Sequence, residues 1–518
     1  MNPALTAAFA LLPEYLGWHV LLSASALLLG VAISLPLAIA AARSPRLRWP
    51  VLAGASLIQT IPSLALLALF YPLLLALSAL SKASFGHGFS ALGFLPSLLA
   101  LTLYSMLPIL RNGAAAILGI DPAVREAADG VGMTARQRLF QVELPLAAPV
   151  IMAGVRTAAV WTIGAATLST PVGQTSLGNY IFAGLQTENW VFVLFGCAAS
   201  AVLALIADQL LGLMEAGART RKPVLAVVGA VGLVAGIALA VSPLAGFGKP
   251  AAYTIGAKNF SEQYILAEVI AGRLQAAGAE VRRKEDLGSA VAYRALAAGE
   301  IDVYVDYSGT LWSNVLGRKD NPGRAEVLKQ LTAELKRRDG VVVLGSLGFE
   351  NAYAFVMRPD RAQALGVASL ADLAREAPKL TLGSDLEFLS RPEWKAVDTA
   401  YGFGFKTKKS YQPTFMYRAL SGGEADVISA FSSDGRIAAD GLIVLTDPKA
   451  AIPPYDAVVL IAPKRAGDRR LLGALSPLIG KVSVEAMRAA NYSVDRDQAK
   501  ASPAEAARAL EERMPLGK

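Results

Sequence analysis

The N-terminal half of this chain contains six apolar segments, each long enough to cross a lipid bilayer as a helix. A bilayer requires about 20 mostly apolar residues in helical form. Segments of that kind lie at about residues 20–42, 51–80, 93–110, 149–170, 190–214 and 223–245. The second contains Pro62 and Pro72, so we expect it to be kinked or broken. The sequence therefore predicts an all-α, polytopic membrane domain of about six helices.

Charged residues make up only 17% of the chain, and they gather in its second half. Residues 251–518 have the charge density of a soluble protein, which predicts a separate domain there. The net charge of +8 is spread without any Lys- or Arg-rich tract with interleaved aromatic residues, so nucleic acid is not an expected partner. The single cysteine, Cys197, excludes an intramolecular disulfide.

Basic residues between the spans indicate the orientation of the membrane domain, because cytoplasmic loops carry an excess of Lys and Arg. Ten basic residues lie in alternate loops, namely Arg43, Arg46, Arg48, Arg111, Arg125, Arg136, Arg138, Arg219, Arg221 and Lys222, whereas the other side carries only Lys82. We therefore expect the N-terminus outside the cytoplasm. On this basis residues 1–222 form the membrane domain, 223–250 a last transmembrane helix and linker, and 251–518 an extracytoplasmic domain.

The loop at residues 121–145 is polar and punctuated by glycines, although it lies between apolar segments. Asp121-Pro122 is typical of a helix start, with an Asp cap and Pro in the first helical position. We expect one short helix over 123–128 and a second over 134–142, which Leu144-Pro145 ends. A polar helix pair inside a membrane region predicts that the loop binds a partner.

This loop resembles the coupling loop of ABC-importer permeases, in which a short helix fits into a groove of a separate ATPase subunit. The resemblance rests on the motif residues Glu126, Ala127, Ala128, Gly132, Leu144 and Pro145. It implies that the small side chains of Ala127 and Ala128 let the partner approach closely, and that Glu126 pairs with a basic group or caps a helix end. Arg136 and Arg138 are expected as inner-leaflet anchors, with rim contacts to the partner as the alternative.

ATP hydrolysis is expected on a different polypeptide, because this chain has no G-x-x-x-x-G-K-[ST] phosphate loop. The segment 420–424 reads LSGGE, like the signature loop of an ABC ATPase, but no phosphate-binding lysine accompanies it. A turn between a helix and a strand is the better interpretation of that segment. We therefore expect no cofactor in this chain, with ATP used by two copies of a partner ATPase.

The second half alternates strand-like and helical segments, which predicts α/β layers. Strands are expected near 253–257, 279–284, 301–305, 341–346, 353–357, 380–383, 426–430, 442–445 and 457–462. The length of this half favours two lobes with a cleft between them. We expect lobe 1 at about 253–350 and 455–518, and lobe 2 at about 355–450.

Four motifs in this half resemble the glycine betaine/carnitine/choline substrate-binding family. They are GAKNFSEQ at 256–263, DVYVDYSGT at 302–310, FSSDGR at 431–436 and Pro454-Tyr455. The membrane half is similar to the permeases of the same osmoprotectant systems. The resemblance implies a type I ABC-importer permease followed by a two-lobed, periplasmic-binding-protein-like domain of type II. It also implies a homodimer in the bacterial inner (cytoplasmic) membrane, and fused chains of this family include ergothioneine importers.

The ligand implied by this resemblance is a small quaternary-ammonium solute, whose trimethylammonium head carries no hydrogen-bond donor. Aromatic faces are then the available attraction for the cation, and a carboxylate at the other end needs Lys, Arg or hydroxyl donors. The family's site carries over to Lys258, Thr310 and Arg391 for the carboxylate, to Tyr307, Tyr353, Phe431 and Tyr455 for an aromatic cage, and to Asn351 beside it.

Two of these positions depart from the family pattern. Phe431 stands where tyrosine is usual, so it keeps the π face and loses the hydroxyl. Asn351 stands where an acidic residue is common in some members, which favours a betaine over plain choline. The sequence leaves open glycine betaine, proline betaine, carnitine, choline and ergothioneine.

Two other classes of function are alternatives. A solute-gated channel or receptor would have a similar binding domain without needing the loop at Glu126. An extracytoplasmic enzyme is disfavoured, because the only histidines, His19 and His87, lie in or beside the membrane part. The soluble half has no Cys/His nucleophile pair and no metal-ligand cluster in its sequence, so we expect no catalytic residue and no metal.

Overall fold

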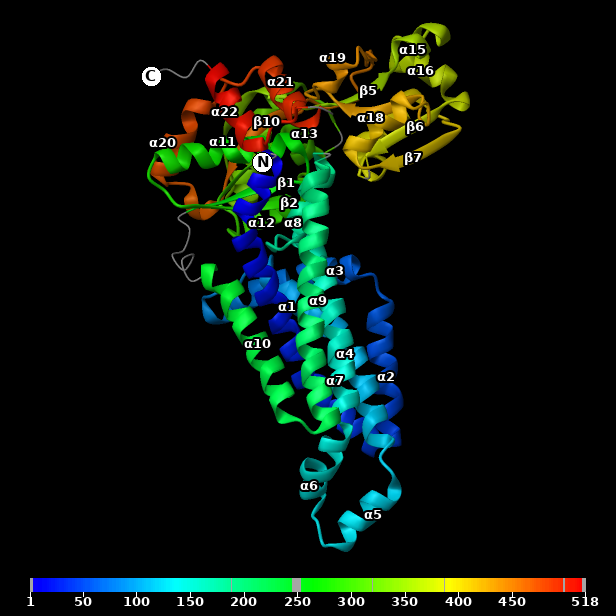
Figure 1. The fold of residues 1–518 in the computed structure, drawn as a ribbon. Coiled ribbons are helices and arrows are strands. Elements are labelled where there is room, and N and C mark those ends of the chain that lie inside the picture. Colours follow the sequence, from blue (N-terminus) through cyan, green and yellow to red (C-terminus); the bar gives the residue numbers. More distant parts are fainter. Residues whose placement is uncertain are drawn as a thin grey trace. The chain divides into compact units, whose positions relative to one another are not determined.

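The computed structural model describes residues 3–187, 189–244, 253–318, 320–385, 387–496 and 499–514. The chain divides into two compact units (Figure 1). The first comprises residues 1–182 and 191–250, and the second comprises residues 183–190 and 251–518. The first unit is helical, whereas the second contains two mixed sheets covered by helices.

Among the described residues, six helical segments are long and apolar enough to cross a membrane, as predicted. They run over Ala4–Arg43, Ser63–Phe85, Phe94–Leu118, Ala135–Val172, Trp190–Thr220 and Pro223–Leu244. The helical elements are α1 (Pro3–Arg43), α2 (Pro45–Thr60), α3 (Ser63–Phe85), α4 (Phe94–Leu118), α5 (Pro122–Gly130), α6 (Ala135–Arg138), η1 (Leu139–Glu143), α7 (Leu144–Ala166), η2 (Thr167–Val172), α8 (Gly178–Gln186), α9 (Trp190–Thr220) and α10 (Pro223–Val241).

The second predicted span, 51–80, is broken into α2 and α3 at Ile61-Pro62. A proline pushes the residue before it out of the helical conformation, and Ile61 is accordingly extended, with ψ 127°. The Ile61 carbonyl, which the break releases from the helix, accepts a hydrogen bond from the Tyr104 hydroxyl. Pro72 lies inside α3 without ending it, so the break falls at the first of the two prolines.

Glycines let the central helices α1, α4 and α7 approach one another closely. A Cβ atom at Gly30 of α1 would lie 1.9 Å from Oγ of Ser105 on α4. One at Gly154 of α7 would lie 2.9 Å from the carbonyl oxygen of Pro108, also on α4. Helices in lipid lack a hydrophobic driving force toward one another, so close packing of this kind holds them together. These three helices form the packed centre of the first unit.

The loop at 121–145 folds into two short helices, as predicted, but its connection to the next span differs. Asp121 caps α5, and Thr134 caps α6 through a capping box. The prediction that Leu144-Pro145 ends the second helix is wrong, because a π turn over Leu139–Glu143 leads directly into α7. Proline lacks only an N–H group that the first turn of a helix does not need, so it begins α7 instead of ending α6.

A cluster of ion pairs within the spans joins α7 to α9. Arg156 of α7 donates to both carboxylate oxygens of Asp208 (3.0 and 2.8 Å) and to Glu215 (2.7 Å), which both lie on α9. Between these acids lies Gly212, where a Cβ atom would be 3.3 Å from Cζ of Arg156. The guanidinium therefore lies against the backbone of α9. Charges inside a span are costly unless they are paired in this way.

The second unit has two lobes, each built on a five-stranded sheet, and the strand order is equivalent in the two. The orders are β2-β1-β3-β10-β4 in lobe 1 and β7-β6-β8-β5-β9 in lobe 2. The fourth strand of each, β10 or β5, is antiparallel to both neighbours, whereas the first three strands are parallel. This is the two-lobed α/β architecture that the sequence predicted. The strands are β1 (Tyr253–Lys258), β2 (Val281–Leu287), β3 (Val303–Tyr307), β4 (Val342–Glu350), β5 (Tyr353–Met357), β6 (Thr381–Asp385), β7 (Thr407–Tyr411), β8 (Val427–Phe431), β9 (Ile443–Val444) and β10 (Asp456–Ile461).

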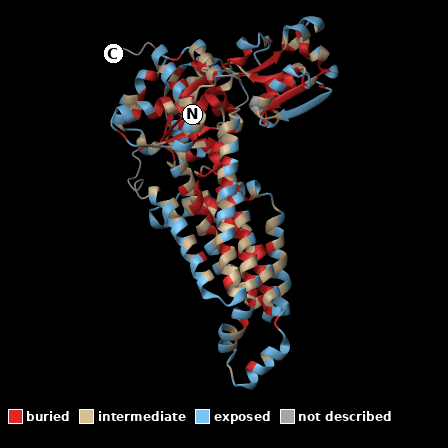
Figure 2. Cartoon of the chain, viewed as in Figure 1, coloured by how far each residue is buried: buried red, intermediate tan, exposed pale blue. Residues whose placement is uncertain are grey.

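Buried residues of this unit gather in the strands of the two sheets (Figure 2). The main helices of lobe 1 are α11 (Ser261–Ala276), α12 (Ser289–Ala297), α13 (Ser308–Thr310), α14 (Arg324–Asp339), α20 (Arg469–Leu475), α21 (Val484–Asp495) and α22 (Pro503–Arg513). Those of lobe 2 are α15 (Pro359–Leu365), α16 (Leu370–Glu376), α17 (Pro392–Tyr401), α18 (Pro413–Ser421) and α19 (Arg436–Ala439). Short turns η4 (Leu311–Val315), η5 (Ala377–Lys379), η6 (Phe388–Ser390), η7 (Pro463–Arg465) and η8 (Ser476–Leu478) complete the elements.

The LSGGE segment at 420–424 forms the predicted turn between a helix and a strand. Helix α18 ends at Ser421, and strand β8 begins at Val427. Gly423 adopts φ +76°, a left-handed conformation that glycine accepts readily. The glycine pair therefore has a local structural explanation.

The ion pairs of Arg156 predict a stability test of the first unit. Arg156→Gln leaves two carboxylates facing each other in the spans, so we expect the Tm of the purified chain to fall by about 5 °C or more. The triple change Arg156→Met, Asp208→Asn and Glu215→Gln removes every charge and should recover most of that loss. Arg219→Gln, at the exposed end of α9, is the matched control. Equal Tm values for Arg156→Gln and Arg219→Gln, measured by thermal denaturation in detergent, would refute the cluster's role.

Candidate functional site

The predicted ligand-binding residues gather where the parallel strands of both sheets end. Lys258 ends β1, Tyr307 ends β3, and Phe431 ends β8. Tyr353 begins β5 and Tyr455 precedes β10, and these antiparallel strands start beside the ends of their neighbours. Ligands of open α/β sheets bind outside the carboxyl ends of the strands. The topology therefore brings residues that are far apart in sequence to one place.

Five aromatic rings from both lobes form a continuous series, which we name the aromatic arc: Tyr307, Phe260, Phe431, Tyr353 and Tyr455. The distances between successive ring centroids are 6.1, 6.4, 5.1 and 5.9 Å. Tyr353 packs directly on Phe431 and, at 4.5 Å, on Phe388, so these rings contact one another. The planes of Phe260 and Phe431 are parallel to within 3°. The arc contains all four predicted cage residues and adds Phe260.

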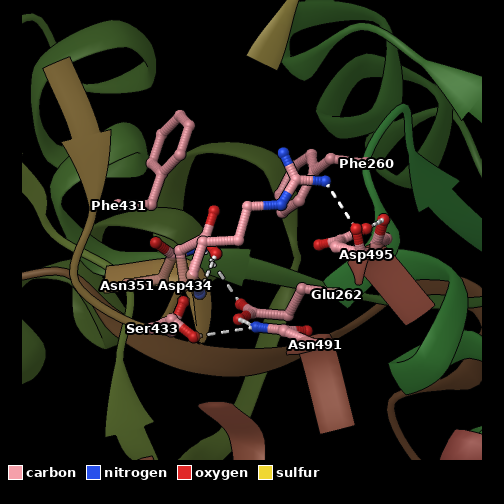
Figure 3. A pocket seen from close by; sticks show the side chains of 10 residues that line it. Phe260, Glu262, Asn351, Phe431, Ser433, Asp434, Asn491 and Asp495 are labelled. Carbon is pink, nitrogen blue, oxygen red and sulfur yellow. Dashed lines mark hydrogen bonds between the residues drawn. The ribbon is translucent and has the colours of Figure 1, made fainter. Parts of the chain in front are cut away.

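A small pocket opens beside the arc, and Figure 3 shows Phe431 and Phe260 on opposite sides of it. Its lining comprises Phe260, Ser261, Glu262, Asn351, Phe431, Ser433, Asp434, Arg436, Asn491 and Asp495. We name it the cleft pocket. Two of the predicted ligand-binding residues, Asn351 and Phe431, belong to this lining.

Glu262 is the hydrogen-bonding centre of the pocket floor. Its carboxylate accepts hydrogen bonds from the Tyr307 hydroxyl (2.6 Å), from Nδ2 of Asn351 (3.1 Å) and from Nδ2 of Asn491 (2.8 Å). Burial raises the pKa of Glu262, and these hydrogen bonds oppose that rise. The carboxylate thus holds together β3, the segment between the lobes and α21.

The same floor presents two acceptor oxygens. Oδ1 of Asn351 and Oδ1 of Asn491 are buried, and neither has a hydrogen-bond partner within the part of the chain that the structure describes. Their amide orientation follows from Glu262, because a carboxylate accepts and each Nδ2 donates to it. Buried acceptors of this kind are costly unless a bound group donates to them.

Asp434, Asp495 and Arg436 form the charged wall of the pocket. The backbone N–H of Arg436 donates to Asp434 (2.9 Å), and its Nη2 donates to the backbone carbonyl of Asp495 (2.9 Å). The Asp495 carboxylate accepts from Ser261 Oγ at 2.5 Å. Burial raises the pKa of Asp495 to about 7; Arg436 opposes that rise, and the charge of Asp434 adds to it. Near neutral pH this wall is therefore poised to gain or lose a proton.

Lys258 is engaged within the protein. Its buried Nζ forms an ion pair with Asp306 and lies 5.2 Å from the ring centroid of Tyr307. Asp306 also accepts a hydrogen bond from the Tyr304 hydroxyl (2.5 Å). In this arrangement Lys258 stabilises the ends of β1 and β3, and its predicted contact with a ligand carboxylate stays a prediction.

Arg391 is likewise engaged with neighbouring side chains, at the Tyr353 end of the aromatic arc. It donates to Thr310 of lobe 1 (3.0 Å) and pairs with Glu387 (3.1 Å) and Glu393 (3.3 Å), and its Cζ lies 5.5 Å from the ring centroid of Tyr353. Glu393 also accepts a hydrogen bond from the Tyr455 hydroxyl. The two predicted carboxylate ligands Thr310 and Arg391 are thus brought together, but the guanidinium on the cleft pocket belongs to Arg436.

Several residues at the site were not predicted. Phe260, Glu262, Asp434 and Arg436 lie inside motifs that the sequence displays, so their positions within GAKNFSEQ and FSSDGR were an available signal. Asn491 and Asp495 lie on α21, more than two hundred residues from the first motif, and nothing in their local sequence marks them. Only the packing of α21 against α11 places them at the pocket.

Four of the six predicted docking residues, Glu126, Ala127, Ala128 and Gly132, lie on the hairpin of α5 and α6, whereas Leu144 and Pro145 begin α7. Glu126 and Ala127 are exposed, whereas Ala128 is buried. Gly132 has φ +82° at the turn, which explains a glycine there. Val131, at the turn of the hairpin, is 74% exposed, and Phe140, in η1, is 58% exposed. Arg138 pairs with Asp129 and Glu143, and its expected role as a membrane anchor stays a prediction.

Comparison with known proteins follows the division into two units. The profile described as the substrate-binding domain of ABC-type glycine betaine transport systems matches residues 251–511, and that of the binding-protein-dependent transport system inner membrane component matches residues 34–220. The chain is 27% identical over 464 residues to the ergothioneine transport permease/ergothioneine binding protein EgtU of Helicobacter pylori (strain G27), covering 85% of this chain and 79% of that protein.

Two further similarities concern one half each. The choline transport system permease protein OpuBB of Bacillus subtilis (strain 168) is 38% identical over 197 residues, covering 38% of this chain and 83% of that protein. A solved glycine betaine/carnitine/choline ABC transporter structure is 27% identical, with a TM-score of 0.44, and covers 50% of this chain and 98% of that one. The chain belongs to the family of substrate-binding domains of ABC-type glycine betaine transport systems, here fused to a multi-pass inner-membrane permease of the same class of importer.

Proposed function

We propose that this chain captures a zwitterionic quaternary-ammonium compound outside the cytoplasm and forms its ATP-driven path across the membrane. The observation that carries the proposal is the cleft pocket, which combines aromatic faces, carboxylates, a guanidinium and buried acceptors. The aromatic faces, carboxylates and guanidinium match the two charged ends of such a ligand, and the buried acceptors match a ligand that also carries N–H donors.

The cation of the ligand fits the aromatic side of the pocket. Phe260 and Phe431 offer two parallel π faces, and a trimethylammonium group is attracted to such faces by roughly 0.5–2 kcal/mol each. Asp434 and Asp495 add negative charge on the adjoining wall. An anionic solute would be repelled by these carboxylates, and a neutral one would gain nothing from their charge.

The carboxylate of the ligand fits Arg436, because its guanidinium lines the pocket. The resemblance pointed to Arg391 instead. In the described structure, Arg391 already bonds to Thr310 and Glu393, so it would have to exchange partners to hold a ligand. Arg436 is also engaged, because its Nη2 donates to the Asp495 carbonyl. We propose it as the carboxylate partner because it lines the cleft pocket, and Arg391 is the alternative.

The pocket floor favours a ligand that also carries N–H donors. The buried acceptor oxygens of Asn351 and Asn491 have nothing to accept from a trimethylammonium group. The imidazole-thione ring of ergothioneine carries N–H groups as well as a betaine end, and EgtU of Helicobacter pylori is named as an ergothioneine transporter. Within the betaine class, this observation favours ergothioneine over glycine betaine, carnitine and choline.

In the membrane, we propose an N-terminus outside the cytoplasm and the α5–α6 hairpin inside, as the distribution of basic residues indicates. Two copies of the chain form the path, and two copies of a separate ATPase bind the hairpins and use ATP, so this chain holds no cofactor. A binding domain on the same polypeptide as its permease meets it at a high effective concentration.

The function is tested on the full chain reconstituted with its ATPase subunit in liposomes. Ergothioneine, glycine betaine, carnitine and choline are compared by calorimetric binding and by ATP-dependent uptake. We expect uptake only with ATP, and tighter binding of ergothioneine than of the other three. Uptake without any ATPase would favour a channel, and conversion of a bound ligand into a product would favour an enzyme. Either outcome would overturn the proposal.

Removing each arginine separates the two positions proposed for the carboxylate. We expect Arg436→Gln to lower the affinity for glycine betaine by roughly ten- to a hundredfold, because one hydrogen bond to a charged group is lost. The affinity for choline, which has no carboxylate, should not change. Arg391→Gln should weaken both ligands similarly, through the packing of Tyr353. Calorimetry with both ligands measures the contrast. A selective loss of glycine betaine in Arg391→Gln alone would place the carboxylate beside Arg391.

The wall of the pocket predicts a pH dependence of binding. A ligand cation favours the ionised form of Asp495, so binding lowers its pKa from about 7 and releases a proton. The affinity should therefore rise as pH rises from about 6 to about 8, by less than about tenfold per unit. Asp495→Asn should abolish the rise.

Asp286→Asn is the matched control, because burial raises the pKa of Asp286 to about 7 as well, outside the pocket. Calorimetry in buffers of different ionisation enthalpy counts the released protons, and a rise that persists in Asp495→Asn contradicts the assignment.

A further inference from the structure

The α5–α6 hairpin has almost no apolar burial to hold it in position. Among its described residues, α5 buries only Ala128, and α6 buries none. Val131 and Phe140 are exposed. Hydrophobic burial, which orders most of a folded chain, is therefore too small here to fix the direction of these helices. Another interaction must transmit a force applied to the hairpin.

A buried carboxylate at the base of the hairpin supplies that interaction. Glu143, the last residue of the π turn, is 3% exposed. Its carboxylate oxygens lie 3.2 Å from Nη2 of Arg43, 3.8 Å from Nε of Arg125 and 3.4 Å from Nε of Arg138. These arginines end α1, lie within α5 and end α6, respectively. We name Glu143 and the three arginines the arginine cluster.

Two of the arginines extend the cluster to further elements. Arg125 donates to the carbonyl of Ile117 in the last turn of α4, and Arg138 pairs with Asp129 of α5 at 2.5 Å. Nε of Arg125 and Nε of Arg138 are buried without a hydrogen-bond partner in the described part of the chain. Both nitrogens are close to Oε1 of Glu143, so its charge is what compensates them. The cluster connects both hairpin helices to the ends of α1 and α4.

We propose that Glu143 is a positioning residue that fastens the α5–α6 hairpin to the spans, so that a displacement of the hairpin moves α1 and α7 with it. Glu143 precedes the first residue of α7, so α7 moves with the carboxylate itself. Arg43 carries the same displacement to α1. Without the carboxylate, three guanidinium groups would face one another around a buried site and would repel. This inference rests on the proposed function, because it assigns the route by which the ATPase drives the spans.

The test uses the full chain with its ATPase in liposomes, loaded with ergothioneine or glycine betaine, whichever binds. Glu143→Gln keeps the shape of the side chain and removes its charge. We expect the number of solute molecules transported per ATP hydrolysed to fall by roughly two- to thirtyfold. The affinity of the binding domain should be unchanged. Glu143→Asp, which retains the charge on a shorter side chain, should restore part of the ratio.

The mobility of the hairpin gives a second readout. A general loss of stability would not change the hairpin alone. A spin label at Ala127, which is exposed, is introduced in a Cys197→Ser background that leaves no other cysteine. We expect the label to become more mobile in Glu143→Gln. Arg46→Gln is the matched control, since Arg46 lies on α2 and is exposed outside the cluster. It should change neither the ratio nor the label.

The outcomes separate this inference from the proposed function. If Glu143→Gln keeps both the wild-type transport ratio and the wild-type label mobility, the fastening role is refuted. If Glu143→Gln does not fold, Arg43→Gln removes only the connection to α1, and the ratio should still fall. If wild-type chain shows no ATP-driven uptake, the proposed function fails, and the label at Ala127 alone decides whether Glu143 holds the hairpin.

Discussion

Buried carboxylates hold together the places where separate elements of this chain meet. Glu143, Glu262, Asp306 and Glu393 are 0–3% exposed, and each accepts a contact from at least one segment remote in sequence. A charge removed from water is costly, and only good geometry with several donors compensates that cost. The positions of the donors are therefore fixed, because a donor that moves away leaves a buried charge unpaired. Apolar packing tolerates sliding far better, so these carboxylates fix the relative placement of helices and lobes where function requires it.

In the second unit, the strand topology already brings polar groups together, and a buried carboxylate then holds them in place. Both sheets have the same strand order, with an antiparallel fourth strand, so the strand ends of each lobe face a common region. Glu262 then joins Tyr307, Asn351 and Asn491 from three different segments into one floor. The aromatic arc runs beside it, so a cation and a set of donors find their partners in one pocket. The same side chains thus serve the fold and provide the chemistry of recognition.

Sequence reasoning succeeded where a local pattern has one physical solution. The six spans followed from length and hydropathy, and the break of the second span followed from Pro62. It missed β7, because the residues of this strand, TKKSY, are mostly exposed at a sheet edge and show no apolar alternation. It misplaced the end of the helix at Leu144-Pro145, because a π turn lets the chain continue through a position where proline usually signals a stop. At the site it found four of the five aromatic residues of the arc, but not Asn491 or Asp495, which α21 brings from the far end of the chain.

The sequence by itself determined the membrane half, the α/β half, the family and the motifs that end the strands, because each depends on composition, periodicity or a contiguous run of residues. Tertiary structure alone decided which side chains meet. It placed Arg436 on the cleft pocket and engaged Arg391 with Glu393, and it engaged Lys258 with Asp306. It also surrounded Glu143 with three arginines from three helices. The physical reason is that ion pairs and hydrogen bonds act over a few ångströms, and distances of that kind between remote segments exist only once the chain has folded.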